Sequence, residues 1–376
     1  MKKIILLVIL GMFIPISSVN AFFVGFGSAG GVEQVIKKGQ EEGEIPTNSG
    51  NEIIPGNPYG VEVVWQKPYN NGKDIAVDLS GNVYITGYIT YITDEVSRDY
   101  LTTKYNSNGE TVWQRRYDNG ILDEAMGIAV DSSGNVYVTG GSYNGINFDC
   151  LTIKYNSNGD TIWQKIYDSG SVDAGYGIAV DSSGNVYVTG FSNYLTIKYN
   201  SNGETVWQRN YGNGSGDAIA IDSFDNIYVT GVLYNGVNKD CLTIKYDPDG
   251  NIIWQKKYDG GGNDWGYGIT VTPFGNIYVG VYTSNPANDH LLIKYNSNGE
   301  IIWQKLYNGG GYWDYAYRIT GDCFDNVYVT DATTKKYNSK GDIVWQISDG
   351  GDDITVDSFG NVYVLTDYRI TKYRQY

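Results

Sequence analysis

Acidic residues recur at one place in the repeated parts of the chain, shortly before a short apolar stretch. The surrounding segments are rich in glycine, as in YDNGILDEAMG, YDSGSVDAGYG and YDGGGNDWGYG. The acids at this place are Asp123, Asp173, Asp217, Asp264 and Asp314, with looser equivalents at Asp74 and Asp353. Gathered carboxylates could bind a cation or a polar ligand, because hard cations prefer oxygen ligands. Alternatively, each carboxylate could accept hydrogen bonds from the backbone N–H groups of its own turn.

Aromatic residues accompany these acids. Trp265 and Trp313 lie in neighbouring repeats and interrupt the repeat pattern, and Tyr176 and Tyr267 follow acids closely in the chain. Exposed aromatic side chains often mark a binding surface. The predicted ligand-binding residues are these four aromatics and four of the acids, Trp265, Trp313, Tyr176, Tyr267, Asp123, Asp173, Asp264 and Asp314.

Residues that catalysis commonly requires are scarce. The only histidine is His290, so the chain lacks the partners for a serine–histidine triad or a histidine-ligated zinc site. Cys150 and Cys241 occupy the same place in DCLTIKY, and we interpret them as small apolar strand residues rather than a disulfide or a nucleophile. No catalytic residue is assigned. No cofactor is expected, although calcium is compatible with the acidic segments, and no metal ligands are assigned.

Two phrases alternate along the chain and indicate the elements that must position these residues. One reads KYNSNGETVWQ at 104–114 and again at 198–208. The other reads IAVDSSGNVYVTG from Ile128 and again from Ile178, within seven related copies whose steps are 53, 50, 41, 50, 50 and 35 residues. Periods of this size indicate stacked supersecondary units.

Each unit is expected to contain four short strands, which in the repeat from Ile128 are IAVD, NVYVTG, LTIKY and TIWQ. β-Branched and aromatic residues are enriched in these pieces, and Asn158-Gly159 between the last two predicts a hairpin. The aspartate of IAVD is expected to cap the turn after it. A tryptophan is expected to pack between units at Trp65, Trp113, Trp163, Trp207, Trp254, Trp303 and Trp345.

Four antiparallel strands repeated in this way predict an all-β fold, a seven-bladed β-propeller. The phrase VEVVWQ at 61–66 resembles a fourth strand that precedes the first unit, and the last unit ends after a third strand at 369–373. We expect these two segments to pair, which would complete the last blade and close the ring without exposed edges. The acids before the first strands would then surround one mouth of a central channel.

The repeat resembles a known family. The phrase GIAVDSSGNVYVTG, followed by LTIKYNSNGDTIWQ, is similar to the bacterial seven-bladed β-propeller repeat called the SBBP repeat. The resemblance extends over about residues 61–376 and recurs in every unit. It implies a secreted or surface-exposed propeller of mostly undefined role, and it brings no catalytic residues with it.

The first residues have the composition of a targeting segment. Lys2 and Lys3 precede an apolar run at 4–16, and Ala21 offers a cleavage site, so residues 1–21 are predicted to be a signal peptide. An uncleaved anchor is the alternative, although the apolar run is shorter than the ~20 residues that span a bilayer. Residues 22–60 are predicted to be a flexible linker and 61–376 the propeller. The expected location is secreted, periplasmic or at the cell surface.

The charge of the chain restricts its partners. Its formal net charge is −15, and without residues 1–21, which contain two lysines and no acid, 25 basic and 42 acidic residues leave −17. Such a surface repels phosphate backbones, so no nucleic acid is expected to bind. No further segment is apolar enough to span a membrane after cleavage, and a monomer is expected. A protein or a polysaccharide is the expected partner.

These observations favour a non-catalytic binding or scaffold module that meets its partner through one face. That face carries the loops from fourth to first strands and from second to third strands. One alternative is a carbohydrate-active hydrolase or lyase that uses loop carboxylates. A quinone-dependent dehydrogenase is disfavoured, since those propellers have eight blades and an adjacent cysteine pair. A purely structural surface protein is a further alternative.

Overall fold

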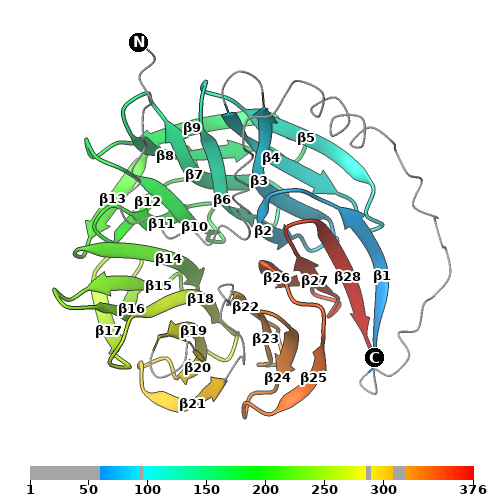
Figure 1. Ribbon diagram of the computed structural model, residues 1–376, viewed down its shortest axis with the longest axis vertical. Helices are drawn as coiled ribbons and strands as arrows, with labels where there is room; N and C mark the ends of the chain where they lie inside the picture. The colour runs from blue at the N-terminus through cyan, green and yellow to red at the C-terminus, as the bar shows by residue number, and fades with distance from the viewer. Residues whose placement is uncertain (1–59, 93–95, 285–288, 308–317) are drawn as a thin grey trace, which may run out of the picture. The chain divides into compact units, whose positions relative to one another are not determined.

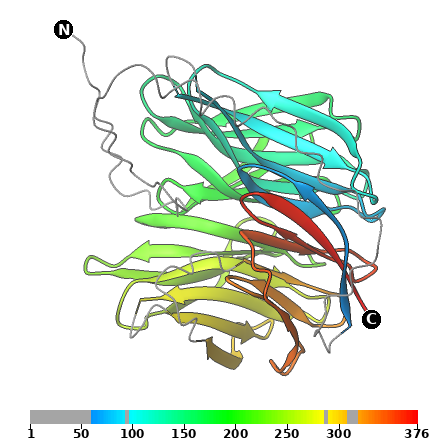
Figure 2. The ribbon, with the colours of Figure 1, turned by 45° about the vertical axis from the view of Figure 1, so that its right-hand side comes forward.

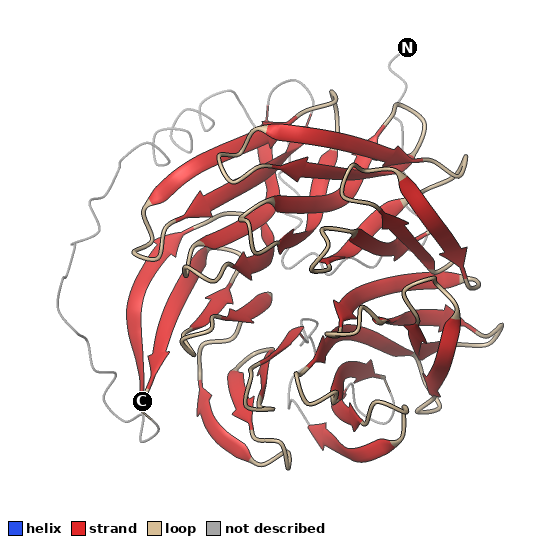
Figure 3. Cartoon of the chain, turned by 180° about the vertical axis from the view of Figure 1, so that it is seen from behind, coloured by secondary structure: helices blue, strands red, loops and turns tan. Residues whose placement is uncertain are grey.

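A computed structural model of the chain describes residues 60–92, 96–284, 289–307 and 318–376. Every regular element in these ranges is a β-strand (Figure 3). No helix that could cross a membrane occurs in the part of the chain that the structure describes. The predicted signal peptide, the predicted linker apart from Gly60, and the predicted site residues Trp313 and Asp314 lie outside the described residues.

The strands form consecutive sets of four, and within a set each strand pairs antiparallel with the next. The first strands are β2 (Gly72–Val77), β6 (Asp123–Val130), β10 (Ala174–Val180), β14 (Gly214–Ile221), β18 (Asp264–Val271), β22 (Arg318–Gly321) and β26 (Asp353–Val356). The second strands are β3 (Val83–Ile92), β7 (Val136–Tyr143), β11 (Val186–Phe191), β15 (Ile227–Tyr234), β19 (Ile277–Thr283), β23 (Val327–Thr330) and β27 (Val362–Leu365).

The outer half of each set completes the sheet. The third strands are β4 (Val96–Tyr105), β8 (Phe148–Tyr155), β12 (Leu195–Tyr199), β16 (Lys239–Tyr246), β20 (Asp289–Tyr295), β24 (Thr334–Tyr337) and β28 (Arg369–Gln375). The fourth strands are β1 (Val61–Pro68), β5 (Thr111–Tyr117), β9 (Thr161–Tyr167), β13 (Thr205–Asn210), β17 (Ile252–Tyr258), β21 (Ile301–Tyr307) and β25 (Ile343–Ile347). The expected four-strand pattern of the repeat is thus confirmed.

The sheets differ in one respect from the seven separate blades that the sequence predicts. The described residues form five four-stranded sheets and one eight-stranded sheet. The eight-stranded sheet contains the sets β10–β13 and β14–β17, because Phe191 at the end of β11 pairs with Ser215 of β14. The all-β antiparallel propeller is therefore observed, with two neighbouring sets joined through one bridge.

The first of the two joined sets has an unusual backbone in the turn between its second and third strands. The turn between β11 and β12 consists of Ser192, Asn193 and Tyr194, all with positive φ, of 106°, 56° and 57°. Such a conformation is strained for a bulky residue. Tyr194 is fully buried, and its hydroxyl donates a 2.6 Å hydrogen bond to the carbonyl oxygen of Leu242 in β16. Packing against the next set thus holds the short turn in place.

The first strand of the described chain pairs with the last one. β1 runs antiparallel to β28, with Val61 opposite Gln375 and Pro68 opposite Arg369. Figures 1 and 2 show these two strands side by side, β1 in blue and β28 in red. The sheet that results has the order β1–β28–β27–β26, so the two ends of the described chain share one sheet.

The turns between first and second strands are held by their aspartates. Asp131 Oδ1 accepts hydrogen bonds from the backbone N–H groups of Ser133 and Asn135, both at 2.9 Å. Its Oδ2 accepts from Asn135 Nδ2 at 2.8 Å and from the Tyr137 hydroxyl at 2.9 Å. The same arrangement recurs at Asp78, Asp181, Asp222, Asp322 and Asp357. The predicted capping role is confirmed.

One repeat has Thr272 in place of this aspartate, and a neighbouring residue replaces the lost carboxylate. Asp325, from the next turn, accepts hydrogen bonds from Thr272 Oγ1 at 2.6 Å and from Asn276 Nδ2 at 2.8 Å. It also pairs with Lys294 Nζ at 2.8 Å. Asp325 has φ = 65°, in the left-handed region, at a turn position where most other repeats have glycine.

The tryptophans of the fourth strands join each sheet to the next, as predicted. Trp113 of β5 donates from Nε1 to the carbonyl oxygen of Ser157 at 3.1 Å and packs against Tyr84 and Tyr155. Its core cluster combines residues of β2–β5 with residues of β6–β8. The Nε1 bonds of the other tryptophans follow the same rule, at Trp65, Trp163, Trp207, Trp254, Trp303 and Trp345.

Candidate functional site

A cavity of about 190 Å³ lies between the first strands. Its walls contain residues from β2, β6, β10, β14, β18, β22 and β26. Two predicted site residues, Tyr176 of β10 and Tyr267 of β18, line it. Pockets for whole small molecules usually have about 300–1,000 Å³. The size of this cavity therefore suits a single side chain or terminal group of a larger ligand.

Three charged residues line the cavity at a position where three other repeats have glycine and one has alanine. Gly127 and Gly177 precede the apolar residue of the IAVD phrase in their repeats, whereas Asp74, Arg318 and Asp353 occupy the matching strand positions. The first strands that carry them, β22, β26 and β2, contact one another in that order. The repeat thus changes in three neighbouring sets, and the change places two carboxyl groups and a guanidinium at the cavity.

The two aspartates share one backbone donor, the N–H of Ile75, which lies 2.8 Å from Asp74 Oδ1 and 2.9 Å from Asp353 Oδ2. Asp74 Oδ2 also accepts from the N–H of Ile128 at 2.7 Å. Burial raises the pKa of Asp74 well above its usual range, and the nearby Asp353 carboxyl raises it further. The pair therefore keeps a proton at pH values where ordinary aspartates are ionised.

Asp217 of β14 adds a third carboxyl group to the cavity. Burial raises its pKa to about 7, although the hydroxyl of Ser215 donates a 2.8 Å hydrogen bond that opposes this shift. Arg318 faces the same space and donates from Nη1 to the carbonyl oxygen of Tyr267 at 2.8 Å. The cavity therefore holds three carboxyl groups against one guanidinium, with part of the negative charge neutralised by protons.

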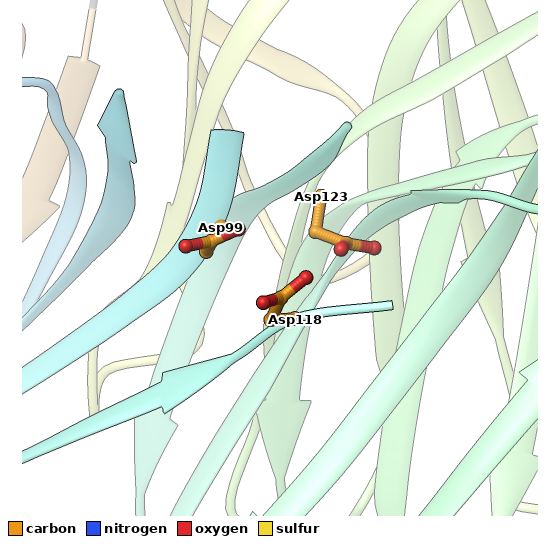
Figure 4. A group of neighbouring side chains, drawn as sticks. All are labelled: Asp99, Asp118 and Asp123. Carbon is orange, nitrogen blue, oxygen red and sulfur yellow. The ribbon is translucent and has the colours of Figure 1, made fainter. Parts of the chain in front are cut away.

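The remaining predicted acids lie away from the cavity, in three groups. Each group combines an aspartate of a third strand, one just after a fourth strand, and one at the start of the next first strand. We call them cluster 1 (Asp99, Asp118 and Asp123), cluster 2 (Asp149, Asp168 and Asp173) and cluster 3 (Asp240, Asp259 and Asp264). In each, one carboxylate oxygen per residue lies within 4.8 Å of the others, and only the middle residue is exposed. Figure 4 shows the three carboxylates of cluster 1 gathered at the end of their strands.

Both interpretations of these acids find support in the clusters. The third member caps its own turn: Asp123, Asp173 and Asp264 accept from the N–H groups of Asn119, Ser169 and Gly260, each at 2.7 Å. The turn-capping alternative is therefore correct for these residues. Each capped carboxylate also faces two further carboxylates, however, which hydrogen bonding within the turn does not explain.

The clusters raise the pKa of their buried members. Burial, followed by the charges of neighbouring aspartates, raises the pKa of Asp123 in cluster 1 and of Asp264 in cluster 3. Asp149 in cluster 2 has its pKa raised by burial and by the charges of Asp168 and Asp173. Repulsion among like charges is thus common to the three groups.

A basic side chain compensates two of the clusters. In cluster 1, Arg116 pairs with Asp99 and, at 2.8 Å, with Asp118. In cluster 3, Lys257 Nζ lies 2.9 Å from Asp240 and 3.4 Å from Asp259. Sequence reasoning did not identify these partners, because the third-strand aspartates are distant from the loops in the chain. The sequence feature that could have identified them is the aspartate that recurs near the start of the third strand, at Asp99, Asp149 and Asp240.

Trp265 occupies a different place from the expected exposed loop. It lies within β18 and is half-buried, with its ring 5.3 Å from that of Tyr282. Lys239 Nζ lies over the Trp265 ring, 5.2 Å from the centroid. The interruption of the repeat is accommodated by local packing, because the first strand begins earlier than the IAVD phrase suggests. His290 is likewise buried, in β20.

The opposite ends of the first strands carry an exposed aromatic row that the sequence reasoning passed over. Four successive turns between first and second strands have phenylalanine at the same position, and each side chain is exposed by about two-thirds or more, namely Phe224 (79%), Phe274 (66%), Phe324 (76%) and Phe359 (75%). The equivalent residues of the other repeats are serines. The sequence shows this feature, because phenylalanine is the third residue of the turn segments DSFDN, TPFGN, DCFDN and DSFGN.

Comparison with known proteins supports the repeat and the fold. Residues 118–147 and 168–193 match the family model described as SBBP, beta-propeller repeat. No curated protein matches the chain. The predicted resemblance to the SBBP repeat is thus confirmed at these two segments.

Solved structures with a similar fold share little sequence. U3-55K has a TM-score of 0.61 at 11% identity, covering 83% of this chain and 98% of that one. The WD40 beta propeller domain of Doa1 has 0.60 at 14% identity, covering 85% and 98%. Virginiamycin B lyase from Staphylococcus aureus has 0.59 at 16% identity, covering 83% and 99%. At such identities the similarity shows the propeller fold alone.

Proposed function

We propose that this SBBP-repeat propeller is a non-catalytic binding module that acts outside the cytoplasm. Its partner would meet the face that carries the connections from fourth to first strands. The observation that carries the proposal is the group of charged residues at the cavity, Asp74, Arg318 and Asp353, in place of the glycine or alanine of other repeats. A residue that only maintained the repeat would keep the small side chain found elsewhere.

The chemistry of the cavity favours one class of partner. A polysaccharide or a protein would fit the exposed face, but the small cavity suits a single protruding group. Three carboxyl groups against one arginine favour a cationic group, and its binding would favour the ionised form of Asp217. We therefore favour a protein partner that inserts a lysine or arginine side chain.

Thermal unfolding of the full chain with defined probes tests this proposal. The probes are a lysine-rich peptide, a glutamate-rich peptide and a set of neutral and acidic polysaccharides. A ligand at about 100 times its dissociation constant adds roughly 2.7 kcal/mol of stability. We expect stabilisation by the lysine-rich peptide alone, stronger at pH 8 than at pH 6, since the pKa of Asp217 is about 7.

Variants at the two ends of the first strands locate the binding face. Asp353→Asn should abolish the stabilisation, whereas Phe274→Ser, at the opposite end, should retain it. Loss of the effect in Phe274→Ser with retention in Asp353→Asn would place the binding face at the phenylalanine row instead. No response to any probe would contradict the cavity as a binding site.

We also propose that the sets form a closed ring of seven blades, with β10–β13 and β14–β17 counted as two. Three observations support this. The first strands contact one another in the order β2, β6, β10, β14, β18, β22, β26 and again β2. Trp345 donates to Gln375 of β28, and Trp65 of β1 donates to Ser107 between β4 and β5. Each sheet is thereby joined to the next.

A hydrolase or lyase is the second candidate, and the shifted pKa of Asp74 is the feature that favours it. A protonated carboxyl beside an ionised one can serve as acid and base. Asp74 and Asp353, however, interact directly with each other. Glycosidase carboxyl groups are usually about 5 Å or more apart. Turnover of a polysaccharide by the purified chain, abolished by Asp74→Asn, would decide for this candidate.

Secretion is proposed from residues 1–21 alone. Fractionation of cells that express the full chain would test it. Recovery of a chain that begins after Ala21 outside the cytoplasm would support cleavage. An intact N-terminus in the membrane fraction would favour the anchor alternative.

A further inference from the structure

Cluster 2 is the one of the three aspartate clusters in which the basic partner is missing. The residue that compensates each of the others lies at the same register of the fourth strand: Arg116 is opposite Leu101, and Lys257 is opposite Leu242. In cluster 2 this register, opposite Leu151, is occupied by Ile166, whose side chain is 59% exposed. An isoleucine cannot neutralise a carboxylate.

The carboxylates of cluster 2 therefore stay uncompensated. Within the described ranges, Asp149, Asp168 and Asp173 take part in no ion pair with lysine or arginine. Three aspartates in such proximity need a positive charge or a proton.

Asp149 provides a second, independent observation. The residue is buried, with only 6% of its surface exposed, and its Oδ1 has no hydrogen-bond partner. Its Oδ2 accepts from Asn144 Nδ2 at 3.0 Å, which fixes the orientation of the carboxylate within the cluster. A buried, unpartnered carboxylate oxygen costs free energy unless something binds it.

Hydrogen bonds within the turn at 168–173 fix the orientation of the other two members, Asp168 and Asp173. Asp173 accepts from the N–H of Ser169 at 2.7 Å and from its hydroxyl at 2.9 Å. Asp168 accepts from the N–H of Gly170 at 2.7 Å through Oδ1. These bonds fix the carboxylates without neutralising their charge. Asp168 is exposed, so one side of the cluster is open to solvent.

We propose that cluster 2 binds a divalent cation and that calcium fits it best. This site is separate from the cavity proposed to bind the protein partner. Calcium binds oxygen ligands at about 2.3–2.6 Å. Oxygens that share one ion therefore lie within about 5 Å of one another, and the three oxygens of cluster 2 lie within 4.8 Å. Water would complete the coordination on the open side. In clusters 1 and 3, the positive charges of Arg116 and Lys257 neutralise the carboxylates in place of an ion.

The comparison among clusters provides matched variants for a test. Calcium binding to the full chain is measured by calorimetry, with terbium luminescence as a second readout. Ile166→Lys gives cluster 2 the compensating amine of cluster 3, and should remove one bound calcium per chain relative to the unmodified protein. Lys257→Ile gives cluster 3 the uncompensated state and should add one.

The exposed position of residue 166 keeps this test independent of folding, since Ile166→Lys changes a surface side chain. Ile166→Leu is the control and should bind calcium as the unmodified chain does. Asp149→Asn should weaken binding by at least tenfold. Equal calcium stoichiometry in Ile166→Lys and the unmodified chain, or no calcium bound by the unmodified chain at millimolar concentration, would overturn the proposal.

Discussion

The two ends of the first strands both carry an aspartate in most repeats, but they use it differently. At the turn into the second strand, Asp131 and its equivalents accept four hydrogen bonds in almost the same geometry each time. At the other end, the carboxylates gather in clusters or line the cavity, and several have buried oxygens without a partner. Carboxylates whose two oxygens both accept hydrogen bonds stabilise the fold, whereas carboxylates with an oxygen that accepts none are available for a ligand.

The difference is also visible in the protonation of the two groups. Hydrogen bonds from Asn135 and Tyr137 lower the pKa of Asp131 against the opposing effect of burial. At the cavity, burial dominates and raises the pKa of Asp217 to about 7. The environment of Asp131 therefore favours its ionised form, whereas the cavity favours the protonated forms of Asp74 and Asp217. Positions that repeat should cost stability when changed, and positions that depart from the repeat should not.

Deletion of residues 61–66 should have the largest effect among the repeating positions. It removes most of β1, including Trp65, and leaves one edge of β28 unpaired. We expect a loss of more than about 4 kcal/mol, because loss of a packed tryptophan costs about 3–5 and the partly buried Trp65 is removed together with the pairing to β28. The exposed edge should also promote association. Size-exclusion chromatography and urea unfolding measure both effects, and a monomer with unchanged melting would disprove the proposed ring closure.

Trp207→Ala should come next, with a loss of about 3–5 kcal/mol. Trp207 is only 8% exposed, packs between Tyr187 and Tyr246, and donates from Nε1 to the carbonyl oxygen of Pro248 at 3.1 Å. Urea unfolding gives the free energy. The neighbouring Val206, 54% exposed, provides the control, and Val206→Ala should change stability by less than about 0.5 kcal/mol. Equal effects of the two changes would refute the packing role.

Asp217→Asn should have the smallest effect, and of opposite sign. The folded pKa of Asp217, about 7, exceeds the value of about 3.9 in an unfolded chain. The stability that the protonated form contributes is therefore complete below pH 4 and is lost as the pH rises through 7. Asparagine stays neutral, so the variant should match the unmodified chain at pH 4 and exceed it by roughly 1–2 kcal/mol at pH 8.

The turn aspartate should show the reverse dependence on pH. The folded pKa of Asp131 is lowered, so its contribution is present above the unfolded value and is lost as the pH falls through the folded one. Urea unfolding of Asp131→Asn and Asp217→Asn at pH 4, 6 and 8 would compare them. If the free energy of unfolding changed with pH in the same way for both variants, the proposed difference between the two ends of the first strands would be wrong.

The repeat made most of the fold predictable, because each strand and turn is written several times in the sequence. The Trp-Gln pairs, the turn aspartates and the pairing of 61–66 with the last strand follow from that repetition. The bridge between Phe191 and Ser215 was missed, since it depends on the positive φ angles of one turn, at Ser192, Asn193 and Tyr194.

The site was predictable only in part. Tyr176 and Tyr267 do line the cavity, but Trp265 packs within its own strand, because the length of a first strand cannot be read from the IAVD phrase. Arg318 was missed although it replaces a glycine of the repeat. The aspartate clusters join residues about 20 positions apart in the chain, and only the register of neighbouring strands brings them together. Positions that depart from the repeat, such as Arg318, would have predicted the site residues better than positions that recur in every repeat.

The central claim is that turn carboxylates stabilise the fold and that the carboxylates of cluster 2 bind a ligand. The most direct measurement is the thermal unfolding of Asp131→Asn and Asp149→Asn, each with EDTA and with calcium. Asp131→Asn should melt lower than the unmodified chain in EDTA, by about 1–3 kcal/mol of stability, and keep the full calcium response. Asp149→Asn should be at least as stable as the unmodified chain in EDTA and lose the calcium response. A destabilised Asp149→Asn that still responds to calcium would contradict the account.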